Sequence, residues 1–197
     1  MQSFRTETEN ILDPRVEKDI LELGRKIHEY QTGKLPEDAF KSLRLARGVY
    51  GQRQLCVQMI RIKLPYGKLL YNQLTNIANV SDKYSNGNLH LTTRQDVQIH
   101  HVSLDKTPEL WEDLEQDKIT LREACGNTVR NITASPFAGI DPKEPFDVSP
   151  YAEALFQYLL RNPVNQDLGR KIKISFSSSE KDSAFSFLHD LGFIPKI

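Results

Sequence analysis

Three segments of the sequence place cations on the polar side of a two-residue alternation, and this pattern constrains the fold most. They read HLTTRQDVQIHHV (90–102), ACGNTVRNITASP (124–136) and GRKIKISFS (169–177), and such alternation predicts β-strands. The cations are Arg94, Arg130, Lys171 and Lys173. A cation that faces an interior is costly unless an anion meets it. The chain is therefore predicted to form a sheet that holds something strongly negative.

Each of these cations also has an ordinary structural interpretation. Arg130 is typical of a partly exposed strand arginine in a surface ion pair, which is worth little energetically. Lys171 and Lys173 are typical of the lysines that protect an edge strand. The polar row of residues 89–100 is typical of an antiparallel sheet with one wetted face. A shared anion site is favoured because all three segments present cations from strands.

The first half of the chain predicts a helix followed by a strand, a helix and a strand. Asp13 and Pro14 form a helix start, and an apolar face continues until Gly33. The residues of that face are Val16, Ile20, Leu23 and Ile27. Residues 58–64 alternate as a strand, a helix then presents Leu70, Leu74, Ile77 and Ala78, and one continuous strand is expected over 89–100. The strand–helix–strand order is the opening of a ferredoxin-like α+β unit.

The second half predicts further helices and strands. Thr107 and Pro108 begin a short helix, residues 120–123 have the pattern of a capping box, and 129–133 is expected to be extended. Ser149 is expected to cap a helix with Tyr151, Leu155, Tyr158 and Leu159 facing inward. Residues 171–177 predict a strand and 182–191 a helix, and the closing FIPKI predicts the start of another strand. A chain that stops there is expected to be truncated.

Composition excludes some partners. The chain has 197 residues, of which 39% are hydrophobic, and 26 basic residues balance 26 acidic ones. Zero net charge argues against nucleic acid or an anionic membrane as the main partner. The first ten residues contain no apolar leader and no run reaches the roughly 18 apolar residues of a membrane span, so a cytoplasmic location is expected. Cys56 and Cys125 lack metal-binding spacing, so no metal site is predicted and both are expected to be reduced and buried.

Five motifs together resemble the siroheme-dependent, ferredoxin-type nitrite/sulfite reductase family, in its N-terminal portion. They are LARGVYGQRQ (45–54), VQMIRIKLPYGK (57–68), LHLTTRQDVQIHHV (89–102), LREACGNTVRNITASPFAGIDP (121–142) and GRKIKISFS. They occur in the family's order and extend over nearly the whole chain. The resemblance implies an α+β fold: an N-terminal arm with helices (1–50), a ferredoxin-like half-domain (51–116) and the first part of a siroheme-binding α+β domain (117–197).

The resemblance also implies roles for particular residues. In this family, cations surround the oxyanion that is bound to the iron, and they are the catalytic residues. The resemblance assigns this role to Arg94, Arg130, Lys171 and Lys173. Arginine grips carboxylates in forked pairs, which suits the eight carboxylates of siroheme. The candidates for this wider cofactor shell are Arg53, Arg61, Thr92, Thr93, Gln95, Gln98, His100, Asn131 and Arg170. For Arg53 and Arg61 a structural ion pair is an equally good interpretation.

By the same resemblance, the parent protein is an assimilatory enzyme that reduces sulfite to sulfide, or nitrite to ammonia, with six electrons from ferredoxin or a flavoprotein. The family binds a 4Fe-4S cluster through four cysteines of its C-terminal half, and those are absent here, so the fragment alone is expected to be inactive. Lys171 and Lys173 as a pair resemble sulfite reductases, since many ferredoxin nitrite reductases have asparagine at the second position.

Two other hypotheses stay open at this point. One is a non-catalytic homologue that binds a tetrapyrrole or an anion, and the other is a small α+β domain that binds an acidic protein. A fragment of this kind is also expected to leave sheet edges exposed, and we expect it to form a homodimer through the strands of residues 57–64 or 89–100.

Overall fold

An antiparallel sheet with four helices forms the first unit of the computed structural model, which describes residues 12–197. The strand order is β1-β2-β4-β3. The strands are β1 (Val49–Gly51), β2 (Val57–Ile62), β3 (Leu89–Leu91) and β4 (Val97–Ser103). The helices are α1 (Pro14–Gln31), α2 (Glu37–Leu45), α3 (Tyr71–Tyr84) and α4 (Thr107–Glu115), with 3-10 turns η1 (Pro65–Gly67) and η2 (Leu104–Lys106).

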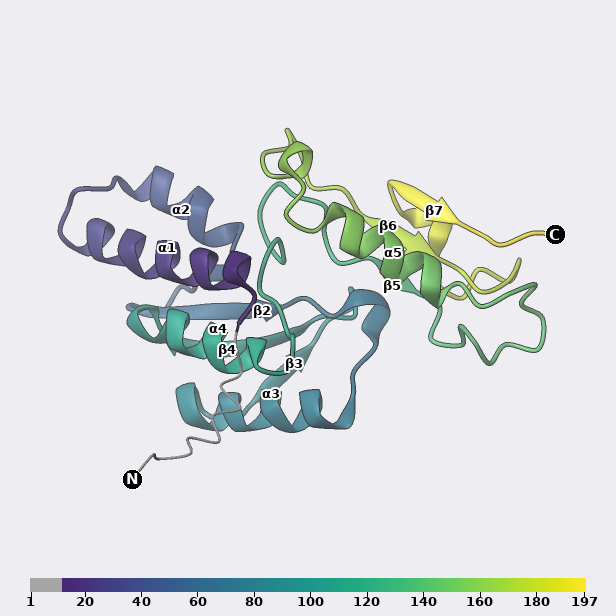
Figure 1. Ribbon diagram of the computed structural model, residues 1–197, viewed down its shortest axis with the longest axis horizontal. Helices are drawn as coiled ribbons and strands as arrows, with labels where there is room; N and C mark the ends of the chain where they lie inside the picture. The colour runs from purple at the N-terminus through teal and green to yellow at the C-terminus, as the bar shows by residue number, and fades with distance from the viewer. Residues whose placement is uncertain (1–11) are drawn as a thin grey trace, which may run out of the picture.

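The second unit is a small parallel sheet with one helix packed beside it. Its strand order is β5-β6-β7. Its elements are β5 (Thr133–Ala134), α5 (Ser149–Leu159), η3 (Pro163–Asn165), β6 (Ile174–Phe176), η4 (Ser186–Leu188) and β7 (Leu191–Phe193). Figure 1 shows the two units side by side, with the C-terminus in the second.

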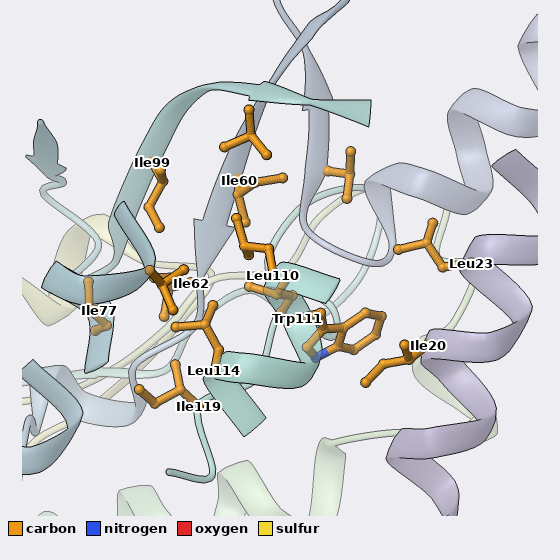
Figure 2. Packing of buried hydrophobic residues seen from close by; sticks show 14 of the residues in the cluster. Ile20, Leu23, Ile60, Ile62, Ile77, Ile99, Leu110, Trp111, Leu114 and Ile119 are labelled. Atoms are coloured by element: carbon orange, nitrogen blue, oxygen red, sulfur yellow. The ribbon is translucent and has the colours of Figure 1, made fainter. Parts of the chain in front are cut away.

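Separate apolar cores hold the two units. In the first, Ile60 and Ile62 of β2 pack with Ile99 of β4 and with Trp111 of α4, and all four side chains are fully buried. Figure 2 shows the Trp111 ring directed toward Ile20 of α1. The smaller core of the second unit includes Val129, Ile132, Ala152, Phe156 and Ile174. The division into domains at residue 116 stays a prediction.

Several predicted elements are confirmed. Asp13 caps α1 by accepting a hydrogen bond from the Arg15 amide (2.8 Å), and Val16, Ile20, Leu23 and Ile27 are buried. The strand after residue 57, the helix that begins at Thr107 and the α+β fold class are also as expected. None of the helices among residues 12–197 is long and apolar enough to cross a membrane.

The prediction of one strand over residues 89–100 is wrong, because the segment is a hairpin. Leu89 pairs with Ile99 and Leu91 with Val97, so β3 folds back on β4. The Thr92 hydroxyl accepts from the amides of Arg94 and Asp96, both at 3.2 Å. Local side-chain acceptors of this kind compete with strand pairing. Arg94 therefore lies in a turn and not on a strand.

Other sequence expectations also fail for local reasons. Residues 182–190 form no α-helix and contain only η4, because Asp182 accepts from the amides of Ser186 (2.7 Å) and Phe187 (3.3 Å) and closes a tight turn. Residues 120–123 start no helix, since the Lys63 amide donates to the Thr120 carbonyl (3.0 Å) and holds that residue in an antiparallel bridge.

The buried face of α5 and one cysteine also differ from expectation. Ala152 and Phe156 are the buried residues of α5, whereas Tyr151 and Tyr158 are 57% and 71% exposed. A tyrosine ring can cover apolar surface while its hydroxyl group stays in water, so these two tyrosines can contribute to packing without being buried. Cys125 is buried as expected, but Cys56 lies in the exposed loop before β2.

Contacts between the hairpin turn, η1 and β5 join the two units. The Gln95 side chain donates to the Ala134 carbonyl (2.7 Å) and accepts from the Ala134 amide (3.1 Å). Asn131 donates to the Leu64 carbonyl (2.6 Å). These bonds place the turn that carries Arg94 against the second unit.

Candidate functional site

Arg94 and Arg130 lie in the junction between the two units, and backbone carbonyls hold both. Arg94 Nη2 donates to the Asn131 carbonyl and to that of Ile174 (3.4 Å). Arg130 donates to the carbonyls of Ala124 (2.7 Å) and Gly126 (3.1 Å). Burial lowers the pKa of both guanidinium groups; Arg130 lowers that of Arg94 further, and Arg61 lowers that of Arg130 further. Carbonyls fix the direction of a guanidinium without neutralising its charge.

The lysine pair runs beside Arg130. Val129 and Ile172 form a parallel bridge, and the Arg130 amide donates to the Ile172 carbonyl (2.9 Å). Because Val129 and Ile172 share a face of this bridge, Arg130 and the two lysines are on the opposite face. Lys171 is exposed and Lys173 is partly buried. The structure thus brings Arg94, Arg130 and the lysine segment to one junction.

A second polar row lies on β2 and β4. Arg61 and Gln98 are opposite each other, and when the Gln98 amide is oriented to satisfy both of its neighbours, its oxygen accepts from Arg61 Nη2 (2.7 Å) and Nε (3.1 Å). The Gln98 nitrogen donates to His100 Nε2 (3.3 Å), and the His100 ring stacks on His90 at 5.8 Å. Burial, and then the neighbouring histidines, lower the pKa of His100. Arg61 is close enough to lower the pKa of Arg130, so this row extends the same positive region.

Three of the predicted shell residues position the backbone. Thr92 closes the hairpin turn, and Gln95 bonds to both polar groups of Ala134. Asn131 is fully buried and donates to the carbonyls of Leu64 and Arg94 (3.0 Å). Its Oδ1 atom has no hydrogen-bond partner among the described residues, and neither has Nε of Arg94. Two buried polar atoms at the junction thus remain unsatisfied by the protein.

Three of the candidate residues do not lie in the junction between the two units. Arg53 lies in the loop before β2, Thr93 in the hairpin turn and Arg170 in the loop before β6, and all three are exposed. Within the described residues, no side-chain hydrogen bond joins them to the other candidates.

The candidate cations share one property. No carboxylate oxygen of residues 12–197 lies within 4 Å of their charged nitrogen atoms. The seven cations are Arg53, Arg61, Arg94, Arg130, Arg170, Lys171 and Lys173. Elsewhere, buried arginines are paired: Arg122 and Arg161 both meet Asp19, at 3.2 and 2.9 Å. Positive groups that are partly buried and unpaired favour an anion between them. The junction can therefore hold a ligand with several negative charges.

Sequence reasoning missed the titratable groups behind the arginines. Asp96 is 4% exposed, and burial raises its pKa to about 7 although Arg61, Lys63 and Arg94 oppose this. Lys63 is buried with its Nζ atom 3.6 Å from the Glu123 carboxylate. Cys125 has a pKa raised by burial. Asp96 and Lys63 both lie on the polar side of an alternating segment, and this position predicts an exposed side chain. The alternation carries no information about the second unit, which covers both residues.

Two family descriptions match consecutive parts of the chain. The nitrite/sulfite reductase ferredoxin-like half domain matches residues 50–117, and the nitrite and sulphite reductase 4Fe-4S domain matches residues 125–196. The chain belongs to the nitrite and sulfite reductase family, as the sequence motifs indicated.

Curated relatives and a solved structure agree with this. The chain is 34% identical over 160 residues to the assimilatory ferredoxin-dependent nitrite reductase of Haloferax mediterranei, covering 75% of this chain and 27% of that protein. It is 31% identical over 188 residues to the chloroplastic ferredoxin–nitrite reductase of Arabidopsis thaliana, covering 91% and 32%. To sulfite reductase [ferredoxin] 1 of Mycolicibacterium paratuberculosis it is 28% identical over 136 residues, covering 69% and 24%.

The structure of the Mycobacterium tuberculosis NirA protein has the same fold, with a TM-score of 0.73 at 22% identity, over 83% of this chain and 34% of that one. The chain spans about a quarter to a third of the length of the curated relatives described above.

Proposed function

We propose that this chain is part of an assimilatory, ferredoxin-dependent reductase of sulfite or nitrite, and that it supplies the cationic oxyanion site and part of the grip on siroheme. The observation that carries the proposal is the group of partly buried cations, Arg61, Arg94, Arg130 and Lys173, that have no carboxylate partner among residues 12–197. The names of the relatives support ferredoxin as the electron donor. The reduced state of Cys56 and Cys125 fits a cytoplasmic location, which is part of the same proposal.

Siroheme fits the residues that are present. Its carboxylates require several cations, and Arg94 Nε is a buried donor that still lacks a partner among the described residues. Arg61, Arg53 and Arg170 would hold peripheral carboxylates, and Arg94, Arg130 and Lys173 would surround the oxyanion. When bound, siroheme supplies the redox-active iron.

The protein's own part in the reaction is electrostatic. Arg94 and Arg130 are already oriented by carbonyls, so they stabilise negative charge on the oxyanion with little reorganisation. Lys171 and Lys173, as ammonium groups, can donate hydrogen bonds to a departing oxygen and supply it with a proton from Nζ. The second ammonium suits sulfite more than nitrite, because sulfite carries more charge.

The 4Fe-4S cluster does not fit this chain alone. Such a cluster is held by four cysteine thiolates, and the sequence has two cysteines, one exposed and one buried. We therefore propose that the cluster ligands come from outside these 197 residues, and that the chain by itself does not turn over substrate.

The experiment is a siroheme titration of the 197-residue chain, followed by absorption. We expect binding by the wild type and at least about tenfold weaker binding by the Arg94→Gln/Arg130→Gln double variant, since two charge-assisted contacts are lost. Lys18→Gln is the matched control, because Lys18 is an exposed cation on α1, outside the junction. Equal affinities of the double variant and the control would contradict the proposal.

A further inference from the structure

Asp96 is a buried carboxylate next to the anion site. It directly precedes β4, is 4% exposed, and has one carboxylate oxygen, Oδ1, without a hydrogen-bond partner among residues 12–197. The Leu64 amide is close enough to lower the pKa of the carboxyl group. A buried carboxylate that lacks a partner is costly when ionised, so this group is poised to take up a proton.

The groups that face Asp96 from the neighbouring elements are mainly cations. They are Arg61 and Lys63 from β2, Arg94 from the hairpin turn, and Arg130 with the Cys125 thiol from the loop before β5. None of these cations lies within 4 Å of the Asp96 carboxylate, so each acts on it through space. Lys63 is itself paired with Glu123. Asp96 is therefore the main carboxylate whose charge opposes the arginines of the junction; Asp190 acts on Arg94 to a smaller extent.

Asp96 is one of the residues that line a cavity. The cavity has a volume of about 620 Å³ and lies between the two units. Its polar lining includes Tyr66, Lys68, Gln95, Asp96, Asp147 and Ser149. This space is large enough for many water molecules, since one water occupies about 30 Å³. A proton can thus reach Asp96 without passing through the anion site.

We propose that Asp96 takes up one proton from solvent when an anion binds at Arg94 and Arg130. The bound anion offsets the positive field that favours the ionised carboxylate, and its own charge repels that carboxylate. One O–H bond forms on the carboxylate, and no other bond changes. This inference rests on the proposed function, because it concerns the same anion site. In a reduction that consumes protons, Asp96 would hold one proton close to each substrate anion that binds.

The test measures sulfate binding by the 197-residue chain between pH 6 and pH 8.5, using NMR shifts. Sulfate is chosen because it resembles sulfite in charge and does not titrate in this range. We expect the wild-type Kd to rise with pH above neutrality, by up to about tenfold per pH unit, as required for one linked proton. In Asp96→Asn the Kd should stay low and lose this dependence.

Asp147→Asn is the matched control, because Asp147 lines the same cavity but is not among the groups that face the arginines. It should follow the wild type. Equal slopes in the wild type and Asp96→Asn would overturn the coupling while leaving the anion site intact. No sulfate binding by any of the proteins at any pH would overturn the anion site itself.

Infrared difference spectra give a second measurement that needs only the wild type. Sulfate should increase the carbonyl band of a protonated carboxyl group, and the band should shift when aspartate is labelled with ¹³C. This result decides the question even if Asp96→Asn does not fold. Sulfate binding without such a band would overturn the proposal.

Discussion

The two lysines of the segment before β6 have different surroundings. Lys171 is exposed, whereas Lys173 is partly buried and its amide donates to the Asp190 carboxylate (2.8 Å). This backbone bond fixes the direction of the Lys173 side chain more firmly than that of Lys171. Of the two ammonium groups, that of Lys173 is therefore the better placed for a defined contact with substrate.

In the complete reductase, we expect Lys173→Asn to reduce kcat/KM for sulfite about tenfold more than for nitrite. Sulfite carries more charge than nitrite and gains more from the second ammonium. Steady-state kinetics with both anions measure this. Lys171→Asn is the control, and its effect should be smaller because the residue is exposed. Equal losses on the two substrates after Lys173→Asn would show that this lysine does not discriminate between them.

Asp96 should make the fold less stable at high pH. Its pKa is about 7 in the folded chain and near 3.8 when unfolded, so the protonated form favours folding. This stability is complete below about pH 4 and is lost as the pH rises through about 7, in total on the order of 4 kcal/mol. Urea unfolding at pH 5 and 8 should show a larger loss in the wild type than in Asp96→Asn. Parallel losses in the two proteins would exclude Asp96 as the cause.

Among the secondary-structure elements, the β3–β4 hairpin has the clearest dependence on one side chain. Gln95 adopts a positive φ of 56° and bonds to both polar groups of Ala134, which is buried. We expect Gln95→Ala to lower the free energy of unfolding by about 1–3 kcal/mol, because buried backbone groups lose their partner. Chemical denaturation measures this. Gln54→Ala, in an exposed loop, is the control and should change stability little; a Gln95 variant as stable as this control would refute the role.

The sequence predicts an element correctly where local signals and packing agree. In α1, the cap at Asp13 and the apolar face of Val16, Ile20, Leu23 and Ile27 require the same helix. In the segment 89–100, alternation favoured a strand while the Thr92 hydroxyl favoured a turn, and the turn prevailed. Alternation shows only which residues share a face of a strand, so it does not reveal that the chain reverses direction between Leu91 and Val97.

The same limit applies to the candidate site. The motifs identified Arg94, Arg130 and the lysine segment, which the structure brings to one junction. The burial of Asp96 and the bonds of Asn131 and Gln95 to the backbone depend on contacts between the two units, which join residues more than 30 positions apart. Contacts over such separations leave no local pattern in the sequence. The catalytic and cofactor roles themselves stay predictions.

For the whole molecule, the strand order changes the expected mode of self-association. β2 and β4 are interior strands with partners on both sides, so the prediction that β2 pairs with a second chain is wrong. In the segment 89–100, only β3 lies at a sheet edge, and its Leu91 is 75% exposed. An exposed edge of this kind invites pairing with another chain.

We therefore expect the isolated chain to form a weak dimer through β3 that Leu91→Lys disrupts, since charge on an edge strand opposes pairing. Sedimentation at increasing concentration measures this. Leu188→Lys is the control, because Leu188 is 79% exposed in the second unit. A wild type that stays monomeric at high concentration would rule the dimer out.

The candidate cations without carboxylate partners make the charge distribution of the molecule uneven. The chain has no net charge, so seven cations without carboxylate partners among the described residues leave an excess of negative charge on the rest of the molecule. Such a field orients small anions during diffusion and speeds their arrival, and dissolved salt screens it within about 10 Å at 0.1 M. The molecule thus has no net charge, yet an oxyanion that approaches the junction meets a positive electrostatic potential.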